Sequence, residues 1–367
     1  MNAGVQVFVY PEELDHVEPD RLAEQVLGLG CDAVSVAVAY HRARRVFPRH
    51  RRVSVLTEST LYVEPERARY GALVPEGASC EPLLRFRDAC ERAGLRFRAW
   101  VVGLHADRLA ASHPDAAAHL LDGTSAGHSL CPSVSAAVEY VAALAGDVAA
   151  QLDPEAVDLE AGFYPAWEPS YTLTLSLDPL SEPARLLGTP CFCPSCLELG
   201  GPDAEARARR AAGPPFGDGP PDDDGIVAEL AAARSAGAER LVDAVADAVH
   251  AEGALLRVFC SGPPAQAALQ GVSPRSLGSA DAVLFGCGPL AGDELQERFA
   301  GLRALAGRTG TVSTNWTPER TELAADVERL AAAGAEGLAL YNLSLVPDEG
   351  LEAFRAAAAA FRAAVPA

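Results

Sequence analysis

Short runs of β-branched and aromatic residues alternate along the chain with longer, alanine-rich segments. The short runs predict buried strands, and the alanine-rich segments predict helices that cover them. Strands are expected over residues 5–10, 32–40, 96–104, 156–164, 255–260, 282–287, 310–316 and 337–343. The clearest helical segments span residues 19–30, 81–95, 135–152, 321–334 and 350–365.

Eight consecutive strand–helix units are typical of one α/β architecture, the single (β/α)8 or TIM barrel, which we expect over residues 1–367. A doubly wound sheet is the alternative, but no glycine-rich dinucleotide fingerprint follows the first strand. In a (β/α)8 barrel the active site lies where the loops after the strands converge. The strand ends are therefore the places to search for chemistry.

Three of these loops, residues 41–80, 105–134 and 165–221, are much longer than the connections usual in such units. Long loops in a compact domain tend to be functional, so we expect the site on their side of the barrel mouth. Residues 197–225 are expected to form a mobile insertion, because "GPPFGDGPPDDDG" (213–225) is rich in Pro, Gly and Asp without apolar periodicity.

Charge and composition exclude several classes of protein. The formal net charge of −20 opposes binding to nucleic acid and to anionic membranes. Lysine is absent from the whole sequence, which excludes Schiff-base aldolases, pyridoxal phosphate enzymes and Walker-type phosphate loops. Neither a signal-peptide pattern nor a long apolar run is present, so we expect a cytoplasmic location and no membrane partner.

The stretch "CFCPSC" (191–196) places three cysteines in six positions. In a reducing compartment such a cluster favours metal binding, and Cys191, Cys193 and Cys196 could surround one tetrahedral Zn²⁺. A closed structural site needs a fourth ligand, for which Cys131 is the best candidate, because it lies in the neighbouring long loop. The alternative is that these cysteines are small buried residues, which is the interpretation preferred for the other five cysteines.

Around these cysteines the chain resembles the zinc-cluster β-galactosidases of glycoside hydrolase family 42. The resemblance covers about residues 128–200, including "SLCPSVSAAVEYV" (129–141), "VDLEAGFYPAW" (157–167) and "CFCPSC". It implies a structural zinc site completed by the upstream cysteine, and a catalytic Glu at the end of the fourth strand. The chain is also similar to uncharacterised bacterial glycosidase-like barrel proteins.

Glu160 is the residue that matches this catalytic Glu. In "AVDLEAGFY" the side chains of Asp158, Glu160 and Gly162 point to one face; if that face is the barrel interior, Glu160 lies near the mouth and Asp158 one step deeper. A carboxyl partly desolvated among Phe163, Tyr164 and Trp167 should have a raised pKa, which suits general acid catalysis. Asp158 is either a second catalytic carboxylate or a buried partner of an arginine.

The chain departs from the family at the seventh strand, where retaining members carry a nucleophilic Glu. Here "STNWTPE" offers Asn315 and Trp316, and Glu319 lies beyond the strand. Glu58 and Glu168, in the loops after the second and fourth strands, are the candidates for a second carboxyl. Retention and inversion both remain open, because they differ in the separation of the two carboxyls.

Polar and aromatic residues at other strand ends predict a carbohydrate pocket. Histidines at neighbouring strand ends beside a Glu favour function, and aromatic rings at a barrel mouth can stack on sugar faces. The predicted set comprises Tyr40, His41, His105, Tyr164, Trp167, Asn315, Trp316, Tyr341 and Asn342.

Six arginines crowd into "HRARRVFPRHRR" (41–52). One interpretation is local pairing with acidic segments such as "PEEL" (11–14). The other is recognition of a carboxylate, phosphate or sulfate on an acidic sugar.

The sequence thus predicts a carbohydrate-active hydrolase with Glu160 as general acid/base, Asp158 and Glu58 as further carboxylates, and a structural Zn²⁺. A metal-dependent sugar isomerase or epimerase, with His41, His105 and Glu160 around a catalytic ion, is one alternative. A non-catalytic carbohydrate-binding barrel is the other, and the missing strand-seven Glu favours it.

Overall fold

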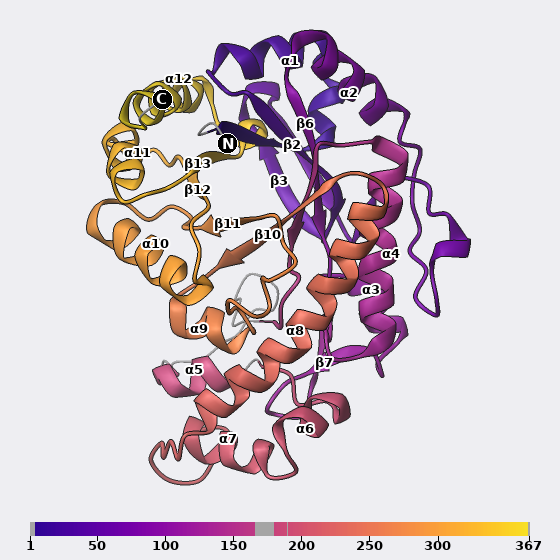
Figure 1. The fold of residues 1–367 in the computed structure, drawn as a ribbon, viewed down its shortest axis with the longest axis vertical. Coiled ribbons are helices and arrows are strands. Elements are labelled where there is room, and N and C mark those ends of the chain that lie inside the picture. The colour runs from indigo at the N-terminus through magenta and orange to yellow at the C-terminus, as the bar shows by residue number, and fades with distance from the viewer. Residues whose placement is uncertain (1–3, 166–179, 189, 366–367) are drawn as a thin grey trace.

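Eight parallel strands close into a barrel, which confirms the predicted (β/α)8 fold (Figure 1). The computed structural model describes residues 4–165, 180–188 and 190–365. The barrel strands are β1 (Gly4–Val9), β2 (Ala33–Tyr40), β6 (Arg96–Val102), β9 (Ala156–Glu160), β10 (Leu255–Ser261), β11 (Ala282–Gly286), β12 (Thr311–Asn315) and β13 (Gly337–Tyr341).

Helices surround the barrel, and their apolar faces pack on the outward-facing residues of the strands (Figure 1). None of the helices in the described ranges is long and apolar enough to span a bilayer. The covering helices are α1 (Pro19–Gly28), α2 (Glu81–Ala93), α4 (Ser135–Leu152), α8 (Ile226–Ala251), α9 (Pro264–Leu269), α10 (Gly292–Ala306), α11 (Leu323–Ala332) and α12 (Asp348–Ala364).

The barrel interior is filled in layers by alternate residues of the strands. In β1, Val5 and Val7 belong to the core under the helices, whereas Phe8 belongs to an aromatic cluster inside the barrel. A polar layer lies deeper, where Gln6 Nε2 donates to Asp158 Oδ2 at 3.3 Å. Because successive side chains of a strand point to opposite faces, Val5 and Val7 face the helices, whereas Gln6 and Phe8 face the barrel interior.

The fourth barrel strand is shorter than the predicted range of 156–164. It ends at Glu160, because Ala161 adopts a left-handed backbone conformation with φ of 52° that an extended strand cannot continue. Phe163 and Tyr164 consequently lie on the loop that follows β9. This turn places Glu160 at the last position of the strand.

The three predicted long loops carry additional elements. The loop after β2 contains a hairpin of β3 (Ala43–Phe47) and β4 (Arg52–Leu56), and β5 (Thr60–Leu61) pairs with the end of β2. The loop after β6 contains α3 (Asp107–Ser112) and a hairpin of β7 (Ala117–His119) and β8 (Ser125–Leu130). Four short 3-10 helices also occur in the described ranges, two of them in the loop after β2: η1 (Pro11–Asp15), η2 (Pro48–His50), η3 (Arg67–Arg69) and η4 (Leu343–Leu345).

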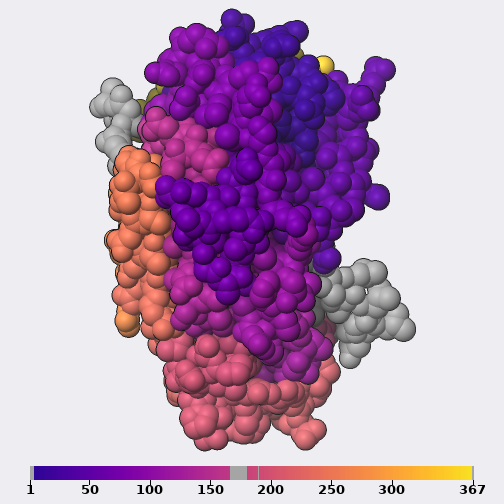
Figure 2. All heavy atoms as spheres, turned by 90° about the vertical axis from the view of Figure 1, so that its right-hand side faces the viewer, coloured from indigo at the N-terminus to yellow at the C-terminus, as the bar shows by residue number. Residues whose placement is uncertain are grey.

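The segment between β9 and α8 contains α5 (Glu182–Gly188), α6 (Pro194–Gly200) and α7 (Ala204–Ala212), which gather at one end of the molecule (Figures 1 and 2). Ala208 and Ala211 of α7 are buried in a small core with Leu230 of α8. The first part of the expected insertion, residues 197–212, is thus mainly helical and packed, and its mobility stays a prediction.

Candidate functional site

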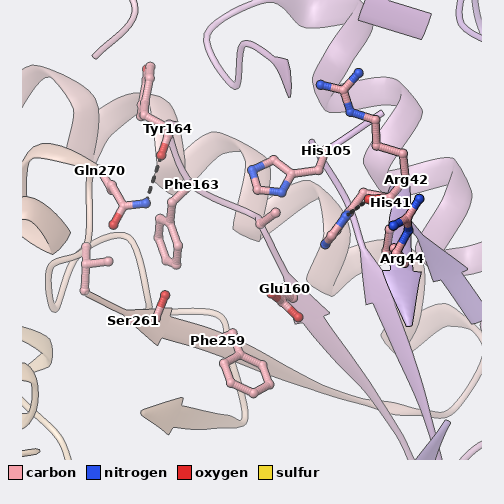
Figure 3. A pocket seen from close by; sticks show the side chains of 13 residues that line it. His41, Arg42, Arg44, His105, Glu160, Phe163, Tyr164, Phe259, Ser261 and Gln270 are labelled. Carbon is pink, nitrogen blue, oxygen red and sulfur yellow. Dashed lines mark hydrogen bonds between the residues drawn. The ribbon is translucent and has the colours of Figure 1, made fainter. Parts of the chain in front are cut away.

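A cavity of about 500 Å³ lies at the carboxyl ends of the barrel strands. Its walls come from the loop after β2, the ends of β9 and β10, and the loops that follow β6, β9 and α9. Figure 3 shows Glu160 between two contrasting walls, one with Phe163 and Tyr164 and the other with arginines and His41. The lining residues are His41, Arg42, Ala43, Arg44, His105, Glu160, Ala161, Phe163, Tyr164, Phe259, Ser261, Gln270 and Val272.

Glu160 is the carboxylate that lines this cavity in the described part of the chain. Its side chain is half-buried, and its Oε2 accepts a hydrogen bond of 2.7 Å from Trp100 Nε1. Trp100 is fully buried inside the barrel on the adjacent strand β6. A rigid indole therefore fixes the orientation of the carboxyl group at the cavity.

Asp158 lies one step deeper and does not line the cavity. It is fully buried, forms an ion pair of 3.2 Å with Arg257, and accepts a hydrogen bond of 2.7 Å from Ser35 Oγ. Burial lowers the pKa of Arg257 to about 10, although the charge of Asp158 opposes the shift. Asp158 thus has the arginine partner that the alternative interpretation of this residue predicted.

Two histidines of the cavity are neutral near pH 7. Burial lowers the pKa of His41, and it lowers the pKa of His105 well below the ordinary value. His41 Nδ1 donates a hydrogen bond of 2.7 Å to the carbonyl oxygen of Arg42, and the rings of His41 and His105 lie 5.8 Å apart. Both strand-end histidines that the sequence predicted therefore lie at the cavity, as neutral imidazoles.

The arginines of residues 41–52 fall into two groups: some pair with nearby acidic residues, and others line the cavity. Arg45 pairs with Glu12 at 2.7 Å and Arg49 pairs with Glu13 at 2.8 Å, which confirms local pairing with the "PEEL" segment. Arg42 and Arg44 instead line the cavity. Spacing alone could not separate the two groups, because the β3–β4 hairpin turns these side chains to different sides.

Tyr40 and Tyr341 form a hydrogen-bonded trio with Tyr10 beneath the cavity. The hydroxyl of Tyr10 lies 2.9 Å from that of Tyr40 and 2.6 Å from that of Tyr341. Burial raises the pKa of all three phenols, which are therefore neutral. Tyr40 lines a second cavity of about 290 Å³, which shares His105 with the first.

The remaining predicted residues are not brought to the cavity. Asn342 is buried, and its Oδ1 accepts a hydrogen bond from the backbone of Ser344. Trp316 packs against the main core at the end of β12, where Asn315 also lies. Glu58 is exposed on the loop after β2, 3.9 Å from Arg108. Trp167 and Glu168 lie outside the described residues.

Sequence reasoning did not select several residues that form the site. Trp100 in β6 and Tyr10 just after β1 point into the barrel. The alternation of inward and outward side chains along a strand could have identified both of them. Phe259 and Ser261 alternate in the same way at the end of β10. Gln270, which donates to the backbone oxygen of Tyr164 at 3.1 Å, follows a short helix and had no signal in the sequence (Figure 3).

The four predicted cysteines gather in a second, separate site. The sulfur atoms of Cys131, Cys191, Cys193 and Cys196 all lie within 4.8 Å of one another, and all four residues are buried. Cys131 Sγ is 3.4 Å from Cys196 Sγ and 3.6 Å from Cys193 Sγ. A disulfide needs about 2.05 Å, whereas four bonds of about 2.3 Å to a tetrahedral metal place sulfurs about 3.8 Å apart. The donor set and its spacing therefore fit a metal ion.

Backbone amides add to this fit. The amide of His119 donates to Cys191 Sγ at 3.2 Å, and the amide of Ser133 donates to Cys131 Sγ at 3.4 Å. Such donors stabilise negative charge on sulfur, which a metal-bound thiolate carries. In the described part of the chain, no other group of three or more metal-ligating side chains is close enough to hold an ion. His41, His105 and Glu160, which the isomerase alternative would use to bind a catalytic ion, therefore do not form such a group.

Tyr164 connects the two sites. Its hydroxyl is hydrogen-bonded to Ser133 Oγ, which lies 3.5 Å from Cys196 Sγ. The same residue lines the Glu160 cavity, where its backbone amide donates to the carbonyl oxygen of Gln270 at 3.1 Å. The position of one cavity wall therefore depends on the packing around the cysteines.

No model of a known protein family matches the chain, and no curated protein matches it in sequence. In structure it is similar to the catalytic domain of β-amylase from Paenibacillus polymyxa, with a TM-score of 0.62 and 12% identity over 100% of both chains. It is also similar to β-galactosidase from Bacillus circulans sp. alkalophilus, with a TM-score of 0.61 and 11% identity, covering 98% of this chain and 56% of that one.

A family 42 β-galactosidase from G. stearothermophilus gives a TM-score of 0.58 at 9% identity and covers 99% of this chain and 57% of the other. The chain thus spans less than two thirds of these β-galactosidases. At such identities the likeness concerns the fold. It supports the resemblance predicted from residues 128–200: the chain has the barrel fold of glycoside hydrolases.

Proposed function

We propose that this protein is a carbohydrate-active hydrolase in which Glu160 is the general acid for cleavage of a glycosidic bond. The observation that carries the proposal is the position of Glu160: it ends β9, is half-buried in a cavity of about 500 Å³ and is oriented by Trp100. A carboxyl that donates a proton to a leaving oxygen needs a fixed orientation and partial desolvation, and this environment supplies both.

The walls of the cavity suit a sugar that carries a negative charge. Phe163 and Phe259 offer aromatic surface, and such rings pack against sugar faces. Arg42 and Arg44 lie on the side opposite Phe163, and guanidinium groups bind carboxylate, sulfate or phosphate. We therefore propose an acidic saccharide as the substrate.

The four cysteines are proposed to hold a structural Zn²⁺. A zinc ion with four thiolate ligands has no open coordination position, so it would brace the fold rather than take part in the reaction. It would join Cys131, after β8, to the segment of Cys191, Cys193 and Cys196 at the start of α6. All nine cysteines are free, which agrees with a reducing compartment such as the cytoplasm, the location we propose.

The test is hydrolysis of a panel of neutral and anionic aryl glycosides by the wild type and by Glu160→Gln. Loss of a general acid lowers the rate by about 100-fold or more, and least for substrates with good leaving groups, which need no proton. Glu91→Gln, an exposed change on α2, is the control and should keep wild-type activity. Full turnover in Glu160→Gln would overturn the assignment, and Glu58→Gln tests one of the further carboxylates suggested by the sequence.

A non-catalytic carbohydrate-binding barrel is the second candidate. It is favoured by one observation: Glu160 is the single carboxylate among the described residues that line the cavity, whereas glycoside hydrolysis ordinarily uses two. A wild type that binds members of the same panel without hydrolysing any of them would select this function.

A further inference from the structure

Arg234, in the middle of α8, differs from the other buried arginines of the described residues. Arg45, Arg257 and Arg320 each form an ion pair with a carboxylate, at 2.7, 3.2 and 2.8 Å respectively. Arg234 is only 3% exposed, and its Nη2 donates a hydrogen bond of 3.4 Å to the carbonyl oxygen of Cys191. Its Nε and Nη1 are buried without a hydrogen-bond partner in the described part of the chain.

A buried guanidinium without an anionic partner is costly, because it has lost its hydration and gained no counter-charge. Aromatic rings supply part of the compensation: the guanidinium lies 5.8 Å from the ring centre of Tyr164 and 5.4 Å from that of Phe192. These contacts are at the outer limit for cation–π attraction and carry no net negative charge. A further source of negative charge is therefore required.

The cysteine cluster is placed to supply that charge. Cys191, Cys196 and Arg234 line the same small cavity of about 10 Å³, so two of the sulfurs and the guanidinium face a common space. Four neutral thiols would leave the cation uncompensated. A divalent ion bound by four thiolates carries a net charge of about −2, which a neighbouring guanidinium partly neutralises.

We infer that Arg234 is the counter-ion of an anionic metal–thiolate centre formed by the four cysteines, and that the charge of the metal-bound cluster and the burial of Arg234 stabilise each other. This inference rests on the proposed metal site and adds a residue that no ligand spacing identifies. It also distinguishes a metal-bound cluster from four packed thiols, because the two predict different effects of removing the charge of Arg234. Removing the positive charge should weaken metal binding, yet it should stabilise the metal-free protein.

The experiment compares the wild type with Arg234→Met and Arg234→Lys. Zinc affinity is measured by competition with a chromophoric chelator, and the melting temperature is measured with zinc bound and after chelation. Arg234→Met should bind zinc about tenfold more weakly or worse, the usual effect of losing a residue next to a metal's ligands. After chelation, Arg234→Met should melt at a higher temperature than the chelated wild type. Arg234→Lys keeps the charge and should retain most of the affinity.

Arg320→Met is the matched control, because Arg320 is equally buried but is paired with Asp326 far from any cysteine ligand in sequence. It should lower the melting temperature by the same amount with and without zinc. The inference would be overturned if Arg234→Met lowered the melting temperature equally with and without zinc and kept a zinc affinity within about twofold of the wild type. If Arg234→Met does not fold, Arg234→Gln replaces it as the neutral variant. A wild type that binds no zinc would instead remove the proposed metal site itself.

Discussion

At the scale of single residues, position in the barrel separates two neighbouring carboxylates. Asp158 and Glu160 share one face of β9, yet Asp158 is paired with Arg257 in the polar interior layer and Glu160 is held by Trp100 at the cavity. One step along the strand, about 6.6 Å for two residues, therefore separates a structural ion pair from a candidate acid.

Three histidines near the cavity give the protein a predictable sensitivity to acid. The ring of His105 lies 5.8 Å from that of His41 and 5.7 Å from that of His128. Burial, followed by the charges of Arg42 and His41, lowers the pKa of His128 to about 4. An unfolded histidine has a pKa near 6.5, so between about pH 6.5 and about pH 4 the unfolded state binds more protons than the folded one.

We therefore expect stability to fall as the pH falls from about 6.5 towards 4. Thermal unfolding at several pH values in this range measures the effect. His128→Asn, which has no titrating imidazole, should show a smaller fall, whereas His113→Asn, outside this row of rings, should behave as the wild type. An equally steep fall in His128→Asn would show that other groups cause the acid sensitivity.

At the scale of elements, α8 packs against Tyr164, the residue that the two sites share. Arg234 and Gly237 lie one turn apart on this helix, facing the cysteines and Tyr164. A Cβ atom at Gly237 would collide with the Tyr164 hydroxyl and crowd Ser133 Oγ. The absence of a side chain at this position lets the helix approach the loop after β9.

Gly237→Ala is therefore expected to destabilise the protein, although alanine is the better helix former by about 1 kcal/mol. Overpacking of a buried contact costs about 1–3 kcal/mol, which outweighs that gain. Chemical denaturation gives the free energy of unfolding. Gly28→Ala, at the end of α1 where a Cβ meets nothing within 4 Å, should be neutral or stabilising. Equal effects of the two substitutions would contradict this role of Gly237.

At the scale of the whole molecule, the cysteine site brings the α5–α7 segment against the loop between β8 and α4. Cys191, Cys193 and Cys196 precede or begin α6, and Cys131 ends the β7–β8 hairpin region before α4. The small core beneath α7 consists mainly of alanine and leucine side chains, which bury little apolar surface. A metal ion bound by the four cysteines would therefore supply a large part of the free energy that holds the α5–α7 segment in place.

Removal of metal should therefore loosen this end of the molecule before the barrel unfolds. Limited digestion with trypsin, which in this lysine-free chain cuts only after arginine, should give new cleavage at Arg207, Arg209 or Arg210 of α7 after chelation. Cys193→Ser should show the same cleavage without a chelator, and Cys260→Ser, a buried cysteine of β10, should not. Identical digestion of loaded and chelated protein would argue against a bracing role.

The sequence by itself predicted the barrel and the four cysteines of the second site, and the family resemblance selected Glu160, although the fourth strand ends earlier than predicted. Strand and helix periods are local properties of a chain, and eight repeats of one pattern leave few ways to close a sheet. Cys131 could be selected because consecutive strands are neighbours in a barrel, so that their loops meet.

Only the tertiary structure decided which side chains share a cavity. It assigned Arg42 and Arg44 to the cavity and Arg45 and Arg49 to Glu12 and Glu13, since a hairpin orients them. It left Asn342 and Trp316 out of the cavity lining, and it placed Arg234 and Tyr164 against the cysteines. Periodicity reports the face on which a side chain lies, whereas a site depends on distances between elements far apart in the chain, which packing alone fixes.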